Sequence, residues 1–345
     1  MKFLNGIQTR FIMTNRENVL MALSHKQPDR CPYHISFTQV AKKKMAEFYG
    51  DSNFEAKLGN CLTELSTAYD EFIEVEPDIW QDKFGVKWNR SIDKDIGVVC
   101  NCLVGPDNID DYQFPDPDEQ AVYDKIAAQI NAESDTLCVL GLGFSLYERA
   151  WTLAGIENVL MAMVADKKFI NDLLDRVLEF NLRVIDNACR LDIDAMRFGD
   201  DWGQQTGLIM GAGLWREFIK PRVRQMYSAV KARGKFVFIH SCGKVEEIFQ
   251  DLIECGVKVF NPFQPEVMDV FEIKKKFGDR LSFFGGISTQ RTLPFGTAEQ
   301  TKDEVRRLID GIGKNGGYIA SPAHAIPADA KAENIATMIE VLQNQ

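Results

Sequence analysis

The sequence predicts an α/β protein built as a single (β/α)8 barrel, the TIM-barrel fold. Short apolar runs of strand length recur along the chain, and segments with helical periodicity separate them. The runs are continuously apolar rather than alternating, which is typical of a parallel sheet covered by helices. A length of 345 residues is compatible with one barrel. We therefore expect one domain over residues 1–345.

Eight apolar runs are the predicted strands. Residues 245–253 carry an apolar stripe at the spacing of an amphipathic helix. Residues 214–233 show the same periodicity, and Pro221 is expected to kink or restart that helix. A helical extension is expected before the first strand. In chain order, the predicted strands span residues 31–37, 77–80, 137–140, 195–198, 235–240, 257–261, 281–285 and 317–321.

One region departs from the alternation of strands and helices. Residues 82–118 are rich in Gly, Pro, Asp and Asn and contain short β-like runs, which predicts a hairpin excursion near the barrel mouth. A doubly wound nucleotide-binding fold would instead require G-x-G-x-x-G after a strand. The nearest match begins at Gly141 and Gly143 and lacks the third glycine, so the barrel is favoured.

Composition excludes several classes of partner. The net charge of −10 is the opposite of the balance expected for a general binder of nucleic acids or anionic membranes. Apolar stretches fall short of the roughly 20 residues that span a bilayer, and residues 1–14 lack the apolar core of a secretory signal. The eight cysteines show no disulfide-framework spacing. We expect a cytoplasmic protein that contacts neither nucleic acid nor membrane.

Two of the four histidines stand where predicted strands end. His240 and Cys242, in His-Ser-Cys-Gly, follow one apolar run, and His324 follows another. Zinc binds imidazole nitrogen and thiolate sulfur, and a set of three protein ligands leaves one coordination position free for chemistry. The alternative is a buried thiol beside a histidine satisfied by backbone hydrogen bonds.

Other polar side chains also follow predicted strands. In a TIM barrel the loops at the carboxyl ends of the strands carry the chemistry. Adjacent Asp200 and Asp201 could bind a metal, act as a general acid or base, since a like charge raises one pKa, or hydrogen-bond to substrate. The alternative is a helix N-cap with one solvated neighbour. The candidate catalytic residues are Asp78, Asp82, Asp200 and Asp201, and the candidate substrate-binding residues are His34, Trp202, Gln264 and Gln290.

A set of motifs spread over nearly the whole chain resembles the uroporphyrinogen decarboxylase superfamily. This resemblance implies a TIM barrel that is often a homodimer. It also implies one of two activities. Decarboxylases of the superfamily act on porphyrinogens without a cofactor, and methyltransferases bind zinc and pass methyl groups to or from a corrinoid protein. The motifs are residues 16–23, 28–32, 198–203, 239–243, 284–291, 316–319, 322–324 and 333–335.

The motifs divide between the two branches. Decarboxylases carry an Arg-Gln-Ala-Gly-Arg-Tyr element after the first strand, whereas residues 36–43 here contain no arginine. An octa-anionic porphyrinogen would therefore lose its bidentate partners. His240 and Cys242 resemble the zinc ligands of the methyltransferases, with His324 as the third ligand where the best-known of those enzymes have cysteine. Asp78 resembles the catalytic aspartate of the decarboxylases, and Asp82 competes for that role.

The resulting hypothesis is a zinc-dependent methyltransferase. It would transfer a methyl group between a small methylated substrate, for example an O-methyl compound, and a corrinoid (cobalamin) carried on a partner protein. The alternative is a cofactor-free decarboxylase of a porphyrinogen or other acidic substrate, using Asp78 and His324. A third hypothesis is a degenerate barrel kept as a binding subunit, which the ring of polar residues at the strand ends disfavours.

Overall fold

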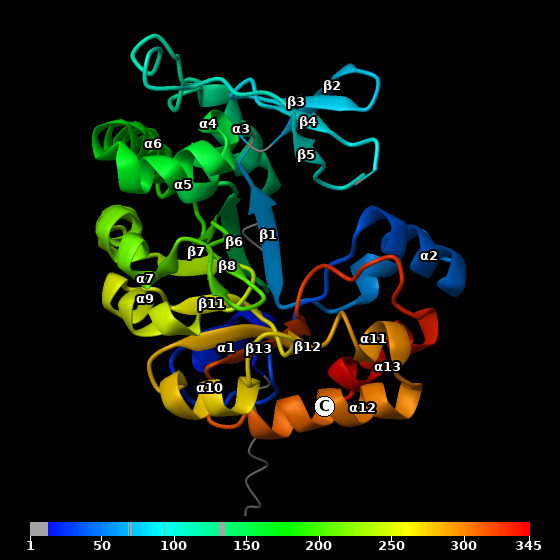
Figure 1. Ribbon diagram of the computed structural model, residues 1–345. Helices are drawn as coiled ribbons and strands as arrows, with labels where there is room; N and C mark the ends of the chain where they lie inside the picture. Colours follow the sequence, from blue (N-terminus) through cyan, green and yellow to red (C-terminus); the bar gives the residue numbers. More distant parts are fainter. Residues whose placement is uncertain (1–12, 68, 70, 93, 131–134) are drawn as a thin grey trace, which may run out of the picture.

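A curved sheet of parallel strands forms the centre of the molecule in the computed structural model, which describes residues 13–67, 69, 71–92, 94–130 and 135–345 (Figure 1). All neighbours in this sheet are parallel, and the order is β1-β6-β7-β10-β11-β12-β13. The α/β class and six of the predicted strands are confirmed. The strands are β1 (Leu62–Ser66), β6 (Leu137–Leu142), β7 (Ala195–Gly199), β10 (Phe236–His240), β11 (Val259–Phe263), β12 (Ser282–Ile287) and β13 (Tyr318–Pro322).

The predicted first strand, residues 31–37, is wrong. Within the described residues the parallel sheet has seven strands rather than eight, and this segment makes only isolated bridges, Tyr33 to Ala320 and Phe37 to Ile326. Pro32 has no amide hydrogen to donate, and the amide of Ile35 bonds to the Asn60 side chain at 2.9 Å. The segment therefore lies beside β13 without the regular ladder of a strand.

The predicted strand at residues 77–80 is also wrong, because this segment is not part of the parallel sheet. Residues 77 and 78 form the turn of an antiparallel hairpin, with Asp78 in the left-handed region at φ 61°. The sheet position goes instead to β1, whose sequence Leu-Thr-Glu-Leu-Ser contains three polar residues among its five. A search for continuous apolar runs passes over such a strand.

A second, antiparallel sheet follows β1 along the chain. Its order is β2-β3-β4-β5, and it begins at Phe72, ten residues before the predicted excursion. Figure 1 shows it beyond the carboxyl end of β1, where chemistry is expected in this class of fold. The strands are β2 (Phe72–Glu76), β3 (Ile79–Asp82), β4 (Lys87–Asn89) and β5 (Val98–Val99), and a separate small hairpin is formed by β8 (Gly203–Gln204) and β9 (Gly207–Leu208).

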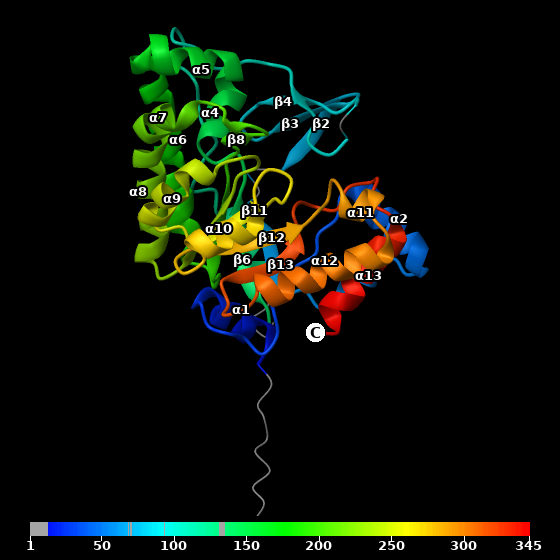
Figure 2. The same ribbon diagram turned by 60° about the horizontal axis from the view of Figure 1, so that its bottom comes forward.

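Helices surround the parallel sheet, as Figure 2 shows from a second side. The predicted helix at 245–253 is confirmed as η4 and α9, and the helix at 214–233 restarts at Lys220 after a π-helical turn, next to Pro221. The predicted N-terminal extension falls partly on residues 1–12, outside the described residues. The helices are α1 (Asn15–Leu23), α2 (Gln39–Tyr49), η1 (Phe54–Lys57), α3 (Gln120–Gln129), α4 (Tyr147–Ala154), α5 (Ile156–Ala165), α6 (Lys167–Ala188), α7 (Gly211–Leu214), η3 (Trp215–Ile219), α8 (Lys220–Ala232), η4 (Glu246–Ile248), α9 (Phe249–Cys255), α10 (Val270–Phe277), α11 (Thr292–Phe295), α12 (Ala298–Gly311) and α13 (Ala332–Gln343).

None of the helices in the described part of the chain combines the length and the apolar character needed to cross a bilayer.

Candidate metal centre

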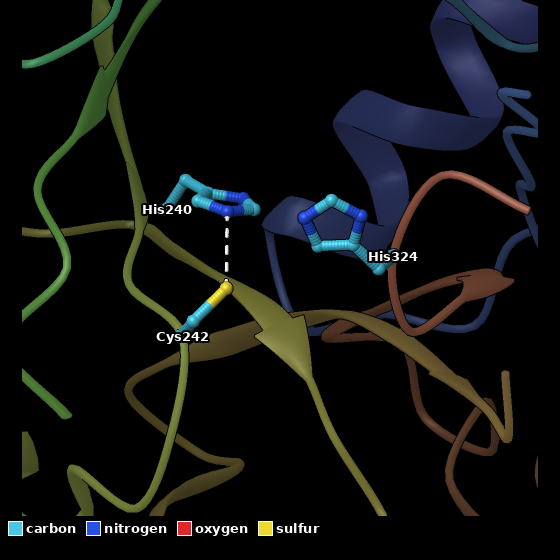
Figure 3. Close-up of side chains that lie close together, drawn as sticks. All are labelled: His240, Cys242 and His324. Atoms are coloured by element: carbon cyan, nitrogen blue, oxygen red, sulfur yellow. Dashed lines mark hydrogen bonds between the residues drawn. The ribbon is translucent and has the colours of Figure 1, made fainter. Parts of the chain in front are cut away.

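Three predicted metal ligands meet at the carboxyl ends of the parallel strands. One donor atom from each of His240, Cys242 and His324 lies within 4.8 Å of the others. His240 ends β10 and Cys242 follows it, whereas His324 comes from the turn after β13, on the other side of the opening (Figure 3). The two imidazole rings approach edge to face, with centroids 5.6 Å apart. The fold thus brings together residues 84 positions apart, the difference between 240 and 324.

The donor set fits zinc. Cys242 Sγ lies 3.5 Å from His240 Nε2. Zn–S and Zn–N bonds of about 2.3 and 2.0–2.1 Å in a tetrahedral arrangement place sulfur and nitrogen about 3.5 Å apart. Two imidazoles and one thiolate form an ordinary zinc ligand set, and three protein ligands are typical of catalytic sites, which keep a position open.

Asn261 orients the His240 ring. Asn261 Oδ1 lies 2.6 Å from His240 Nδ1, and Asn261 Nδ2 donates to the Phe284 carbonyl at 3.0 Å. The second bond fixes the amide so that its oxygen faces the imidazole. His240 Nδ1 must then carry the hydrogen, and the Nε2 lone pair points to Cys242. Burial lowers the pKa of His240, which also favours the neutral form that binds metals.

Replacement of Asn261 by alanine is expected to weaken zinc binding. Removing the partner of a ligating histidine typically lowers metal affinity about 10–100-fold, because the ring loses its fixed tautomer and orientation. Competition with a chromogenic zinc chelator measures this affinity. Asn334→Ala is the matched control, because Asn334 is a buried asparagine that donates to backbone carbonyls in α11 and at its C-terminal end. Equal zinc affinity in the two variants would contradict the role of Asn261.

The loop that carries Cys242 is held from two sides. Asp201 Oδ1 accepts from the Cys242 amide at 2.7 Å, and Gln264 Oε1 accepts from the Gly243 amide at 2.8 Å. Gly243 has φ of 84°, and a Cβ there would lie 2.4 Å from the carbonyl carbon of Gly203. The glycine of the His-x-Cys-Gly motif therefore permits a contact between backbones that fixes the thiol.

The charges around Cys242 favour a bound cation. Burial, Asp201 and Glu148 all raise the pKa of the Cys242 thiol. The pKa of Glu148 is itself raised by burial and by the charges of Asp201 and Asp200. Carboxylates gathered around a thiol repel its ionised form, and a divalent cation reverses that effect because a coordinating thiol loses its proton.

Asp200 and Trp202 lie behind the metal-binding loop. Asp200 is fully buried and accepts from the amides of Tyr147 and Glu148 and from Trp202 Nε1, at 3.2, 2.7 and 2.8 Å. Burial raises the pKa of Asp200 to about 7, and these three donors act against that rise. Both oxygens are thus engaged in joining the end of β7 to the first turn of α4.

A cavity of about 340 Å3 opens beside the candidate ligands. Each of the seven parallel strands contributes to its lining, together with the predicted residue His34. His34 Nε2 lies 3.6 Å from Glu64 Oε2, and Arg197 Nη1 donates to Glu64 Oε1. These charges hold the pKa of Glu64 well below its usual range although burial opposes them.

Three further predicted residues contact neither this cavity nor the loop that carries Cys242. Asp78 is exposed at a hairpin turn and pairs with Lys94 at 2.9 Å, and Gln290 is exposed. Asp82 is buried, accepts from the amides of Phe84 and Val86, and pairs with Arg149 Nη1 at 2.8 Å. Its contacts are those of a residue that shapes the loop after β3.

Glu64 and Arg197 line the cavity but are absent from the predicted site. Arg197 did carry a signal, because a charged side chain within the apolar run 195–198 is rarely buried without a partner or a function. Glu64 lies on a strand that the apolar pattern did not reveal. Asn261 also lines the cavity, and its position at the end of an apolar run was the available signal.

Residues 82–345 match the family described as uroporphyrinogen decarboxylase (URO-D). The chain belongs to the uroporphyrinogen decarboxylase family. The match includes the whole candidate metal centre and all of the cavity except the segments around His34 and Glu64. The membership inferred from the sequence motifs is therefore confirmed.

Curated relatives from both branches of the URO-D family resemble this chain. A methylcobamide:CoM methyltransferase, MtaA, of Methanosarcina barkeri is 28% identical over 131 residues, which are 38% of this chain and 36% of that protein. The matched stretch thus spans about a third of that relative's length. A uroporphyrinogen decarboxylase of Methylococcus capsulatus is 20% identical over 254 residues, 70% of each chain.

A solved methyltransferase structure has a similar fold. A methyltransferase from Methanosarcina mazei superimposes with a TM-score of 0.73 and covers 96% of this chain and 99% of its own. The sequence identity of that pair is 17%, so the likeness concerns the arrangement of the backbone.

Proposed function

We propose that this protein is a zinc-dependent methyltransferase that moves a methyl group between a small methylated substrate and a corrinoid carried by a separate protein. The observation that carries the proposal is the convergence of His240, Cys242 and His324 at the edge of the cavity. The similarity to MtaA supports the same class of reaction.

The decarboxylase alternative finds less support in the cavity. The cavity volume of about 340 Å3 lies at the low end of the range of roughly 300–1,000 Å3 for ligand pockets. Arg197 is the one arginine among its described lining residues, and that arginine is paired with Glu64. An octacarboxylate tetrapyrrole would require more space and more cationic partners.

The chain's own residues divide the work of such a site. Bound at these three ligands, zinc would supply Lewis-acid polarisation of the heteroatom that bears the methyl group. Asn261 keeps the lone pair of His240 Nε2 available, and Gln264 holds the loop that carries Cys242. We propose Asp201 as the acid–base group, because it is the predicted aspartate that contacts this loop.

Metal analysis and a methyl-transfer assay test the proposal together. The purified protein is expected to contain about one zinc per chain, as a single three-ligand site requires. It should transfer methyl groups from methoxylated compounds to reduced cobalamin, followed by the change in corrinoid absorbance. Chelation should abolish transfer and added zinc should restore it. Conversion of uroporphyrinogen to coproporphyrinogen by the zinc-free protein would overturn the proposal in favour of the decarboxylase.

A further inference from the structure

Arg197 lies deeper in the cavity than the candidate metal ligands. In the parallel register between β7 and β10, Gly199 is paired with His240. Arg197 precedes Gly199 by two residues and therefore points to the same face of the sheet. Two residues along a strand correspond to about 6.6 Å. The guanidinium thus belongs to the floor of a cavity whose rim carries His240 and His324.

Glu64 and His34 fix the position of the Arg197 side chain. Arg197 Nη1 donates to Glu64 Oε1, and Glu64 Oε2 faces His34 Nε2 at 3.6 Å. Both oxygens of the carboxylate therefore have a partner within the protein. The side chains of Arg197 and Glu64 keep 27% and 22% of their surface exposed, so the pair faces the cavity rather than the core.

Arg197, on the floor of the cavity, has more hydrogen-bond donors than the acceptors of the protein occupy. A guanidinium carries five N–H groups, and Glu64 is the one hydrogen-bond acceptor for Arg197 among the residues that the structure describes. Gly141 and Gly199 form the adjacent wall without side chains, and Arg197 Nη2 lies 3.9 Å from where a Cβ of Gly141 would be. The remaining N–H groups therefore face open space that a planar oxyanion could fill.

The lining disfavours a cationic substrate. Quaternary ammonium groups are bound by cages of several aromatic rings. Phe284 is the one Phe, Tyr or Trp among the described lining residues, so the cavity has no such cage. A quaternary ammonium group also has no acceptor for the N–H groups that the guanidinium on the floor presents.

We propose that Arg197 binds a carboxylate at the far end of the substrate, while the methylated heteroatom lies at the His240–Cys242–His324 end of the cavity. The substrate class is then a small methoxylated carboxylic acid. This inference rests on the proposed function for the identity of the reacting end. Glu64 competes with the substrate for the guanidinium and keeps it in place, so it acts as a positioning residue.

Two acids and their matched amides test the carboxylate site. Binding of methoxyacetate and 4-methoxybenzoate is measured by calorimetry or ligand-observed NMR against methoxyacetamide and 4-methoxybenzamide, which have the same shape without the charge. Because charge-assisted hydrogen bonds are about twice as strong as neutral ones, at least one acid is expected to bind about tenfold more tightly than its amide. Equal binding of each acid and its amide, or no binding by any of the four, would overturn the proposal.

Two substitutions with opposite expected effects strengthen the test. Arg197→Gln should remove the preference for the acid. Glu64→Gln should increase affinity for the acid several-fold, because it removes the competing negative charge; a merely structural ion pair predicts no such gain. Arg222→Gln is the control, since Arg222 is a buried arginine paired with Asp175 away from the cavity. Retention of the preference in Arg197→Gln, or loss of acid binding in Glu64→Gln, would contradict the assignment.

The test of the carboxylate site can succeed or fail independently of the test of the methyltransferase proposal. Binding is measured on the full chain with zinc and after removal of zinc by a chelator. A preference for the acid that persists without the metal belongs to Arg197. If the protein showed that preference but neither bound zinc nor transferred methyl groups, the carboxylate site would stand and the methyltransferase proposal would fall.

Discussion

Cys242→Ala is expected to lose zinc and methyl transfer while keeping its fold. The thiolate is the one anionic donor in the proposed set, and His240 and His324 alone offer two neutral nitrogens. Removing even an outer partner of a metal ligand costs about 10–100-fold in affinity, so loss of this ligand should cost more than about 100-fold. Elemental analysis and chelator competition give the affinity, and circular dichroism reports the fold.

Cys255→Ala provides the matched control for this variant. Cys255 is a buried free thiol at the end of α9, outside the cavity. The Cys255→Ala variant should keep its zinc and its methyl-transfer activity. A Cys242→Ala protein that retained one zinc per chain with unchanged affinity would show that the metal, if bound, sits elsewhere.

Substitutions of His324 are expected to separate two roles for this residue. His324→Ala should weaken zinc binding by about 100-fold or more, as for the loss of any direct ligand. His324→Cys should keep the metal, since thiolate is an equally good donor, but should lower the rate. Added thiolate charge reduces the Lewis acidity that polarises the leaving group. Zinc affinity and the turnover rate are measured on both variants.

The contrary outcome would assign His324 to acid catalysis or to substrate binding. In that case both variants would keep zinc at the affinity of the unmodified protein and would lose turnover alike. His25→Ala serves as the control, because His25 bonds to Lys258 and does not line the cavity.

The sequence predicted the elements whose burial is uniform. β10 and β12 are mostly apolar because helices cover one face of the curved sheet and its interior packs against the other, so their composition alone indicates them. The apolar pattern did not predict β1, because its residues Glu64 and Ser66 face the cavity and interrupt the apolar run. Residues 77–80 were misassigned because a short apolar run cannot distinguish a barrel strand from a hairpin strand.

The candidate site was predictable to the extent that its chemistry is local. His240 and Cys242 are two residues apart, and the rule that barrel loops meet at one end was sufficient to add His324. The Arg197–Glu64 pair spans 133 residues of sequence, and its partners depend on strand order and register. For Asp82 and Asp200 the sequence shows a carboxylate but not the amides and side chains that contact it in the fold.

The side chain of Asn261 spans from His240 on β10 to the Phe284 carbonyl on β12, so three neighbouring strands hold one imidazole. The ring of His324 is exposed in a turn and makes no hydrogen bond with any residue that the structure describes. The ligand His240 is therefore held rigidly by the sheet, whereas the ligand His324 is carried by a turn that constrains it less. Changes in ligand geometry during a reaction cycle would be absorbed by the turn, and the sheet would keep its register.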